Sequence, residues 1–110
     1  GDEVFTEKLK SSIERNLDDH QFDLTRLSEE LNMSPVQIRR KLRAVTGLRT
    51  VEFIRKYRLQ KARTMLSQKT ATVSEVAYLT GFESLSYFTR MFQEEFGIKP
   101  SEYLNSDPAS

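Results

Sequence analysis

Residues 38–54, IRRKLRAVTGLRTVEFI, and residues 88–104, FTRMFQEEFGIKPSEYL, are two versions of one pattern placed fifty positions apart. Residue character is kept at the pairs Ile38/Phe88, Arg40/Arg90, Leu42/Phe92, Gly47/Gly97, Glu52/Glu102, Phe53/Tyr103 and Ile54/Leu104. Upstream, Leu27 and Met33 match Val76 and Phe82, one residue out of step. Each copy carries the turn signals of a helix-turn-helix, so the repeat predicts two such units in one chain.

Apolar spacing predicts helices along almost the whole chain and no strand. The first helix has a stripe at every fourth residue, namely Phe5, Leu9, Ile13 and Leu17, and the segment 18–23, DDHQFD, interrupts it. Side chains that cap helix starts then stand at Asp23, Ser34, Thr72 and Ser84, with capping-box partners at Gln37 and Glu75. Turns are expected at 32–33 and Gly81, and helix ends at Gly47 and Gly97.

These signals predict an all-α chain in which a long helix connects two helix pairs. The expected segments are an N-terminal helix (1–21), a first helix-turn-helix (22–49), a connecting helix (50–68), a second helix-turn-helix with a tail helix (69–105) and a tail (106–110). The candidate core of the connecting helix comes from Val51, Ile54, Leu59, Ala62 and Leu66, and that of the next short helix from Val76, Ala77 and Leu79.

Composition excludes several classes of function. The 110 residues contain no Cys, so a disulfide or thiolate zinc site is impossible, which suits a cytoplasmic protein. The single His20 lies in an acidic break, and adjacent carboxylates such as Glu29 and Glu30 diverge on a helix. No apolar run approaches the roughly 20 residues that a membrane helix needs. We therefore expect no enzyme, metal site, cofactor or membrane contact.

The positive charge is concentrated in the middle of the chain, although the net charge is only +1. Residues 39–63 hold Arg39, Arg40, Lys41, Arg43, Arg49, Arg55, Lys56, Arg58, Lys61 and Arg63 against the single acid Glu52, and acids outnumber bases on both sides. This basic belt is either an ordinary solvated surface or a phosphate-binding surface, because local field rather than net charge governs contact with phosphates.

Helical spacing assigns candidate base-reading residues to the second helix of each unit, which enters the major groove in a helix-turn-helix. With Ile38, Leu42 and Val45 inward, the first unit presents Val36, Gln37, Arg39, Arg40 and Arg43. With Phe88, Phe92 and Phe96 inward, the second presents Leu85, Ser86, Thr89 and Arg90. Arginine suits guanine, glutamine suits adenine, and Val36 or Leu85 suits a thymine methyl. Two roles are open for Tyr87, namely packing in the core and contact with DNA.

Phosphate contacts are expected beside the helix starts that follow each reading helix. The candidates are Arg49, Thr50, Arg55, Lys56, Lys99 and Ser101. Cationic and hydroxyl side chains hold phosphate oxygens, and the N-terminus of a helix adds backbone donors.

The run VSEVAYLTGFESLSYFTRMFQEEFGIKPSEYL, 73–104, resembles the signature of the AraC-type transcription regulators. The residues in register are Ala77, Gly81, Phe82, Ser86, Tyr87, Phe88, Arg90, Phe92, Phe96, Gly97, Pro100 and Tyr103. The first copy, LSEELNMSPVQIRRKLRAVTG, and the connecting segment FIRKYRLQKARTMLS also resemble that family, so the resemblance covers residues 22–105. The acidic N-terminal helix resembles the version attached to hybrid two-component sensors of Bacteroides-like bacteria.

The resemblance implies a seven-helix domain that binds double-stranded DNA and regulates, in most cases activates, transcription. It carries recognition roles to Val36, Arg39 and Arg40 in the first unit and to Leu85, Ser86, Thr89 and Arg90 in the second. Leu85, Gln93 and Asn105 depart from the common pattern, which predicts weaker reading by the second unit. Implied partners are RNA polymerase, sensor or receiver domains of a parent chain and a second copy. The alternative is a helical protein-interaction module that uses the basic belt.

Overall fold

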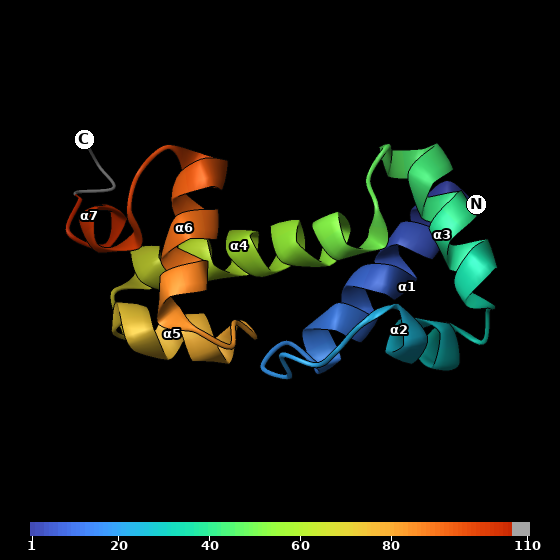
Figure 1. Ribbon diagram of the computed structural model, residues 1–110, viewed down its shortest axis with the longest axis horizontal. Coiled ribbons are helices and arrows are strands. Elements are labelled where there is room, and N and C mark those ends of the chain that lie inside the picture. Colours follow the sequence, from blue (N-terminus) through green and yellow to red (C-terminus); the bar gives the residue numbers. More distant parts are fainter. Residues whose placement is uncertain (107–110) are drawn as a thin grey trace. The chain divides into compact units, whose positions relative to one another are not determined.

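The computed structural model describes residues 1–106 and contains seven helices and no strand within them (Figure 1). They are α1 (Asp2–Arg15), α2 (Leu24–Leu31), α3 (Pro35–Thr46), α4 (Thr50–Gln68), α5 (Val73–Leu79), α6 (Leu85–Phe96) and α7 (Pro100–Leu104). The expected all-α fold with a long connecting helix is confirmed. All of the expected tail except Ser106 lies outside the described residues.

The chain forms two compact units, the first from Gly1 to Tyr57 and the second beginning at Arg58. The boundary falls within α4, so this helix supplies its first turns to one core and its remaining turns to the other. Each unit thus contains one helix pair of the sequence repeat together with part of α4.

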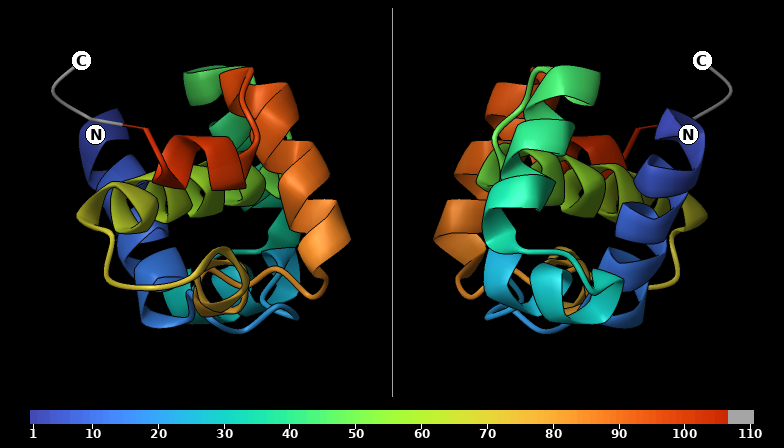
Figure 2. Two further views of the ribbon diagram at one scale, coloured as in Figure 1. Left: turned by 90° about the vertical axis from the view of Figure 1, so that its left-hand side faces the viewer. Right: turned by 90° about the vertical axis from the view of Figure 1, so that its right-hand side faces the viewer.

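The core of the first unit lies where α2 packs against both α1 and α3 (Figure 2, right). Its buried apolar residues are Phe5, Leu9, Ile13, Leu17, Phe22, Leu27, Ile38, Leu42, Phe53 and Ile54. The first helix is shorter than its apolar stripe predicts, since it ends at Arg15. The Asn16 side chain turns back and donates to the Ser12 carbonyl at 2.8 Å, and Leu17 stays buried from the following turn.

The core of the second unit lies where the phenylalanines of α6 pack against residues of α4 and α5, three helices whose ribbons are seen in Figure 2, left. Its buried residues are Leu59, Ala62, Leu66, Val76, Ala77, Phe82, Phe88 and Phe92. Neighbouring rings pack edge to face, with centroids 5.0 Å apart for Phe82 and Phe88 and 4.7 Å apart for Phe92 and Phe96. Such pairs add specific geometry to the burial of apolar area.

Two candidate core residues are exposed, and Val45 and Phe96 are only half-buried. Val51 is 56% exposed and Leu79 is 49% exposed. Each lies two to three residues from a buried pair, Phe53 with Ile54 or Val76 with Ala77. At about 100° per residue this spacing turns the side chain away from the core face.

The helix starts follow the predicted caps. The side chains of Asp23, Ser34, Thr72 and Ser84 accept hydrogen bonds from the backbone N–H groups of Arg26, Gln37, Glu75 and Tyr87. Gly47 and Gly97 end α3 and α6 in the left-handed conformation, with φ of 77° and 75°. The sequence repeat is therefore a repeat of backbone geometry.

Upstream of α3 and α6 the two copies are one residue out of step, because the turn of the second unit contains one extra residue. The backbone N–H of Met33 bonds to Ser28 O in the first turn, and that of Phe82 bonds to Ala77 O in the second, 49 positions later. Ser34 and Ser84, which cap α3 and α6, are fifty positions apart. Glu83 is the extra residue between these two landmarks, so the turn lengthens by one residue without changing either helix.

None of the helices in residues 1–106 combines the length and the apolar character that a membrane span requires.

Candidate DNA-contacting surfaces

The outer face of α3 gathers arginines around a shallow depression in the first unit. Ile38 and Leu42 turn one face of α3 into the core, where their exposed fractions are 0% and 1%. The opposite face and the loop after it line a depression of about 480 Å³, formed by Arg39, Arg40, Arg43, Ala44, Leu48 and Arg49. The three arginines of α3 that are expected to read bases and one residue expected to bind phosphate thus line one depression.

The three arginines of α3 are not neutralised by the protein. Arg39, Arg40 and Arg43 are exposed and make no hydrogen bond or ion pair within the described part of the chain. Arg49 differs, because its Nε lies 3.1 Å from Glu52 Oε1, which also accepts the Arg49 backbone N–H at 3.0 Å. These two hydrogen bonds, the backbone one first, lower the pKa of Glu52. The free positive charge therefore lies on α3 itself.

Val36 and Gln37 begin the same helix with different roles. Val36 is 43% exposed and available for apolar contact. Gln37 Oε1 accepts the Ser34 backbone N–H at 2.9 Å, and Ser34 Oγ accepts the Gln37 backbone N–H at 3.1 Å. A bidentate contact with adenine needs both ends of the glutamine amide. The capping box occupies one of them, so base reading by Gln37 would require this hydrogen bond to open.

The residues expected to contact phosphate at the start of α4 differ in how far their side chains are exposed. Thr50 is only 7% exposed, and its Oγ1 is buried without a hydrogen-bond partner within the described residues. The Thr50 hydroxyl therefore does not face solvent. Arg55 is half-buried and Lys56 is exposed, and Arg55 contributes to the lowered pKa of Glu52.

The second unit presents α6 in the same way but with fewer charges. Phe88 and Phe92 are fully buried, whereas Leu85, Ser86 and Arg90 are exposed and Thr89 is half-buried. The positions that match the arginine-lined depression hold Thr89, Arg90, Gln93, Glu94, Ile98 and Lys99. The four arginines thus correspond to a threonine, an arginine, a glutamine and a lysine, and Ala44 corresponds to a glutamate. Lys99 and Ser101 are exposed at the start of α7.

Among the arginines assigned to base reading, Arg90 is the one that lies over an aromatic ring within the described residues. Its guanidinium carbon lies 5.5 Å from the centre of the Tyr87 ring and over that ring. Tyr87 is 37% exposed, and its ring centre is 6.1 Å from that of Phe82. Tyr87 therefore packs partly on the core and partly under Arg90.

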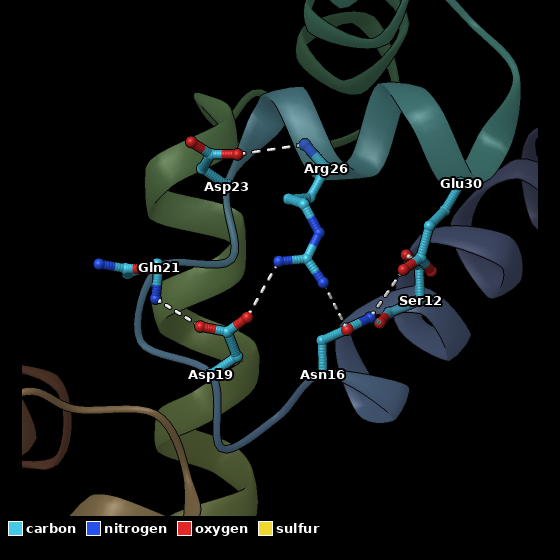
Figure 3. Close-up of polar contacts among 7 residues, drawn as sticks. All are labelled: Ser12, Asn16, Asp19, Gln21, Asp23, Arg26 and Glu30. Carbon is cyan, nitrogen blue, oxygen red and sulfur yellow. Dashed lines mark hydrogen bonds and ion pairs between the residues drawn. The ribbon is translucent and has the colours of Figure 1, made fainter.

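A polar network, shown in Figure 3, holds α2 against α1 in the first unit. Arg26 donates to Asp19 Oδ2 and to Asn16 Oδ1, both at 3.0 Å. Asn16 Nδ2 donates to Glu30 Oε2 at 3.0 Å, and the buried Ser12 donates to Glu30 Oε1 at 2.7 Å. The sequence treated Glu30 as a surface carboxylate. Its partners come from a helix 14 to 18 positions earlier in the chain, so no local pattern indicates the network.

The network also sets the charge state of its acids. The hydrogen bond from Ser12, with further ones from Arg15 and Asn16, lowers the pKa of Glu30. The Gln21 backbone N–H and then the Arg26 side chain lower the pKa of Asp19. Both carboxylates are thus held ionised where they receive hydrogen bonds.

Not every cation of the basic belt is a freely solvated surface charge. Arg58 is buried and donates from Nη1 to the Thr80 carbonyl at 3.0 Å. Arg63 lies over the Phe96 ring at 4.5 Å, and Lys41 lies over the Phe5 ring at 4.9 Å. Arg58 thus belongs to the core of its unit, whereas the exposed Lys41 and the half-buried Arg63 pack on aromatic rings. Among residues 1–106, no group of three or more metal-ligating side chains comes together.

Residues 27–106 match a family model described as a helix-turn-helix domain. The matched region begins within α2 and extends through α7. The chain belongs to the AraC-type helix-turn-helix family. This family consists of DNA-binding transcription regulators rather than enzymes.

Individual relatives agree with this assignment. The chain is 35% identical over 104 residues to histidine kinase P4 of Formosa agariphila, covering 94% of this chain and 8% of that protein. It is 30% identical over 100 residues to the transcriptional activator AggR of Escherichia coli, covering 91% and 37%. The crystal structure of the DNA-binding domain of AdpA, in complex with a target DNA, superimposes with a TM-score of 0.79 at 26% identity, covering 91% and 88%. The chain therefore spans well under half of the two full-length relatives.

Proposed function

We propose that this AraC-type domain binds double-stranded DNA by sequence, with α3 of the first unit as the principal reader. The observation that carries this proposal is the uncompensated charge on α3. Arg39, Arg40 and Arg43 are exposed and unpaired within the described residues, on the face opposite a fully buried stripe. Arginine donors in this position suit the O6 and N7 atoms of guanine in the major groove.

Val36 extends the reading surface of α3 with an apolar contact. It stands on the first turn, is 43% exposed and offers a branched methyl surface that suits a thymine methyl. Lys56 and Arg55 on α4 and the cation of Arg49 supply phosphate contacts that position the unit without reading sequence. For Thr50 only the backbone N–H at the start of α4 remains available for a phosphate, because the hydroxyl is buried.

The second unit contributes a weaker contact through Leu85, Ser86, Thr89 and Arg90. Arg90 is the only arginine on α6, and Glu94 stands where the first unit has Ala44. Fewer cations next to a carboxylate attract phosphates less strongly. Lys99 and Ser101, both exposed, are the phosphate contacts of this unit.

The alternative of a protein-interaction module that uses the basic belt has less support. Such a module needs a continuous cationic surface. Here Arg58 is buried, Arg63 covers Phe96 and Lys41 covers Phe5. The remaining charge lies mainly on the outer face of a helix-turn-helix.

We further propose that the domain is the output module of a longer regulator that activates transcription in the cytoplasm. The name of AggR supports activation, and the name of histidine kinase P4 supports a two-component parent chain with sensor or receiver domains. Contact with RNA polymerase and pairing of two copies in the full-length protein complete this proposal. Pairing would raise the effective concentration of each domain at a double site.

A salt titration tests the proposed function. Binding is measured on a selected duplex and on a scrambled duplex of equal length. The salt concentration is varied from about 50 to about 200 mM, a range over which affinity that depends on phosphate contacts falls steeply. We expect a steep slope on both duplexes and a dissociation constant at least about a thousandfold lower on the selected one. Weak binding that ignores sequence would favour the protein-interaction module.

A further inference from the structure

We propose that Tyr87 positions Arg90 for base reading and thereby compensates for the low charge of the second unit. The inference rests on the proposed function and concerns the third residue of each reading helix. That position is Gln37 in α3 and Tyr87 in α6. The two residues use the position in different ways.

In the first unit, the third residue is committed to the helix start. The Gln37 side chain accepts the Ser34 backbone N–H, and the Ser34 side chain accepts the Gln37 backbone N–H, which completes a capping box. Arg40, one turn later, makes no hydrogen bond, ion pair or ring contact within the described residues. It must therefore lose its rotamer freedom when it binds a base, which costs free energy for a long side chain.

In the second unit, the third residue does not complete a capping box. Ser84 accepts the Tyr87 backbone N–H at 3.1 Å, but the Tyr87 side chain does not take part in capping. Instead, the ring lies against Phe82, which is 4% exposed and belongs to the core. A ring supported in this way is a fixed platform at the exposed start of α6.

The guanidinium of Arg90 lies over this platform at 5.5 Å. A guanidinium over an aromatic face is attracted by the ring quadrupole, and its N–H donors point outward from its edge. Arg90 makes no hydrogen bond or ion pair within residues 1–106, so these donors remain available. Tyr87 thus restricts Arg90 before DNA arrives and leaves its base-reading groups free. Tyr87 is a positioning residue, and Arg90 makes the contact.

A double-mutant cycle on base discrimination tests this inference. Dissociation constants are measured for a duplex series in which each base pair of the second block is replaced in turn. Arg90→Ala should lose about 5- to 150-fold discrimination at one base pair, the range for a bidentate arginine contact. Tyr87→Ala should lose about two- to fivefold at the same base pair, and nothing further in the Arg90→Ala background. Tyr87→Phe should keep the discrimination, because it keeps the ring.

The matched control is the corresponding pair in the first unit. Gln37→Ala and Arg40→Ala should act additively on discrimination at the base pair read by Arg40. Thermal unfolding of each variant, followed by circular dichroism, separates loss of reading from loss of fold.

Additive effects of Tyr87→Ala and Arg90→Ala, or an equal loss on every duplex, would overturn the role of Tyr87. A wild-type domain without sequence preference would instead contradict the proposed function itself.

Discussion

The side chain of Arg58, only 5% exposed, donates a hydrogen bond of 3.0 Å from Nη1 to the carbonyl oxygen of Thr80. Thr80 ends α5 and begins the turn of the second helix-turn-helix, and it is itself fully buried. A cation of the sequence belt is therefore part of the core, where it satisfies an acceptor that α5 leaves open at its end. The turn depends on α4 through this contact.

Arg58→Met should destabilise the second unit. Methionine fills similar space but leaves the Thr80 carbonyl without this donor, which costs about 1–3 kcal/mol for a buried group. Urea unfolding followed by circular dichroism measures the change. Arg63→Met is the control, because it removes a cation–π contact with Phe96, and such a contact at an exposed site stabilises a protein by only about 0.5–1 kcal/mol. A smaller loss for Arg58→Met than for Arg63→Met would contradict the structural role of Arg58.

Gly47→Ala and Gly97→Ala should destabilise the two units to the same extent. Both residues have φ near +75°, and a Cβ added at either would meet no atom within 4 Å. The cost is therefore conformational, about 1–2 kcal/mol for each alanine. Asparagine at either position should cost less, because it tolerates this conformation better. Thermal unfolding tests the ranking, and a neutral alanine at either glycine would be inconsistent with it.

Glu30→Gln should destabilise the first unit at neutral pH by about 1 kcal/mol, since it weakens charged hydrogen bonds at a partly exposed site. The pKa of Glu30 is lowered in the folded chain, first by Ser12. Its ionised form therefore stabilises the fold above the unfolded pKa of about 4, and this contribution disappears as the pH falls through the folded pKa.

Urea unfolding of wild type and Glu30→Gln between neutral and acid pH checks this dependence. The difference between the two proteins should shrink as the pH falls below about 4. Glu29→Gln, an exposed neighbour, is the matched control and should follow wild type throughout. A Glu30→Gln effect that stays constant with pH would show that the charge of Glu30 contributes nothing.

Arg40→Ala should reduce base specificity more than Arg90→Ala. Arg40 stands among Arg39, Arg43 and Arg49, whereas Arg90 is the only arginine of α6. The measurement is a competition series with one base pair replaced at a time. Equal losses of specificity for the two variants would contradict the proposal that α3 contributes more to base reading than α6.

Lys56→Ala should weaken binding to all duplexes alike. Lys56 is exposed on α4, outside the reading helix, so its proposed contact is with phosphate. Removing one such contact lowers the salt slope by about one unit. A loss confined to one sequence would place Lys56 among the base-reading residues.

Local signals in the sequence were enough to predict most of the fold. Capping residues such as Ser34 and Thr72 and the left-handed Gly47 and Gly97 act within a few residues of themselves, so their patterns are readable along the chain. The outward position of Arg39 and Arg40 follows from the same helical period. By contrast, the exposed Val51 and Leu79 depend on which neighbour each helix meets, and the sequence does not state this.

The roles of polar residues were harder to predict for the same reason. Gln37 is expected to read adenine, and its capping partner Ser34 is only three positions away, so local patterns predict two roles for the same side chain. Glu30 and Arg58 bond to partners at least 14 positions away. Charge patterns alone treat both as surface residues.

Selection from random duplexes tests the central claim most directly. We expect the wild-type domain to select two short blocks about ten base pairs apart, the spacing of successive major grooves. A domain carrying Arg39→Ala and Arg40→Ala should lose the better-defined block, and one carrying Arg90→Ala should lose only part of the other. Selection of no common sequence by the wild-type domain, or unchanged blocks in the Arg39→Ala and Arg40→Ala variant, would contradict the assignment of α3 as principal reader.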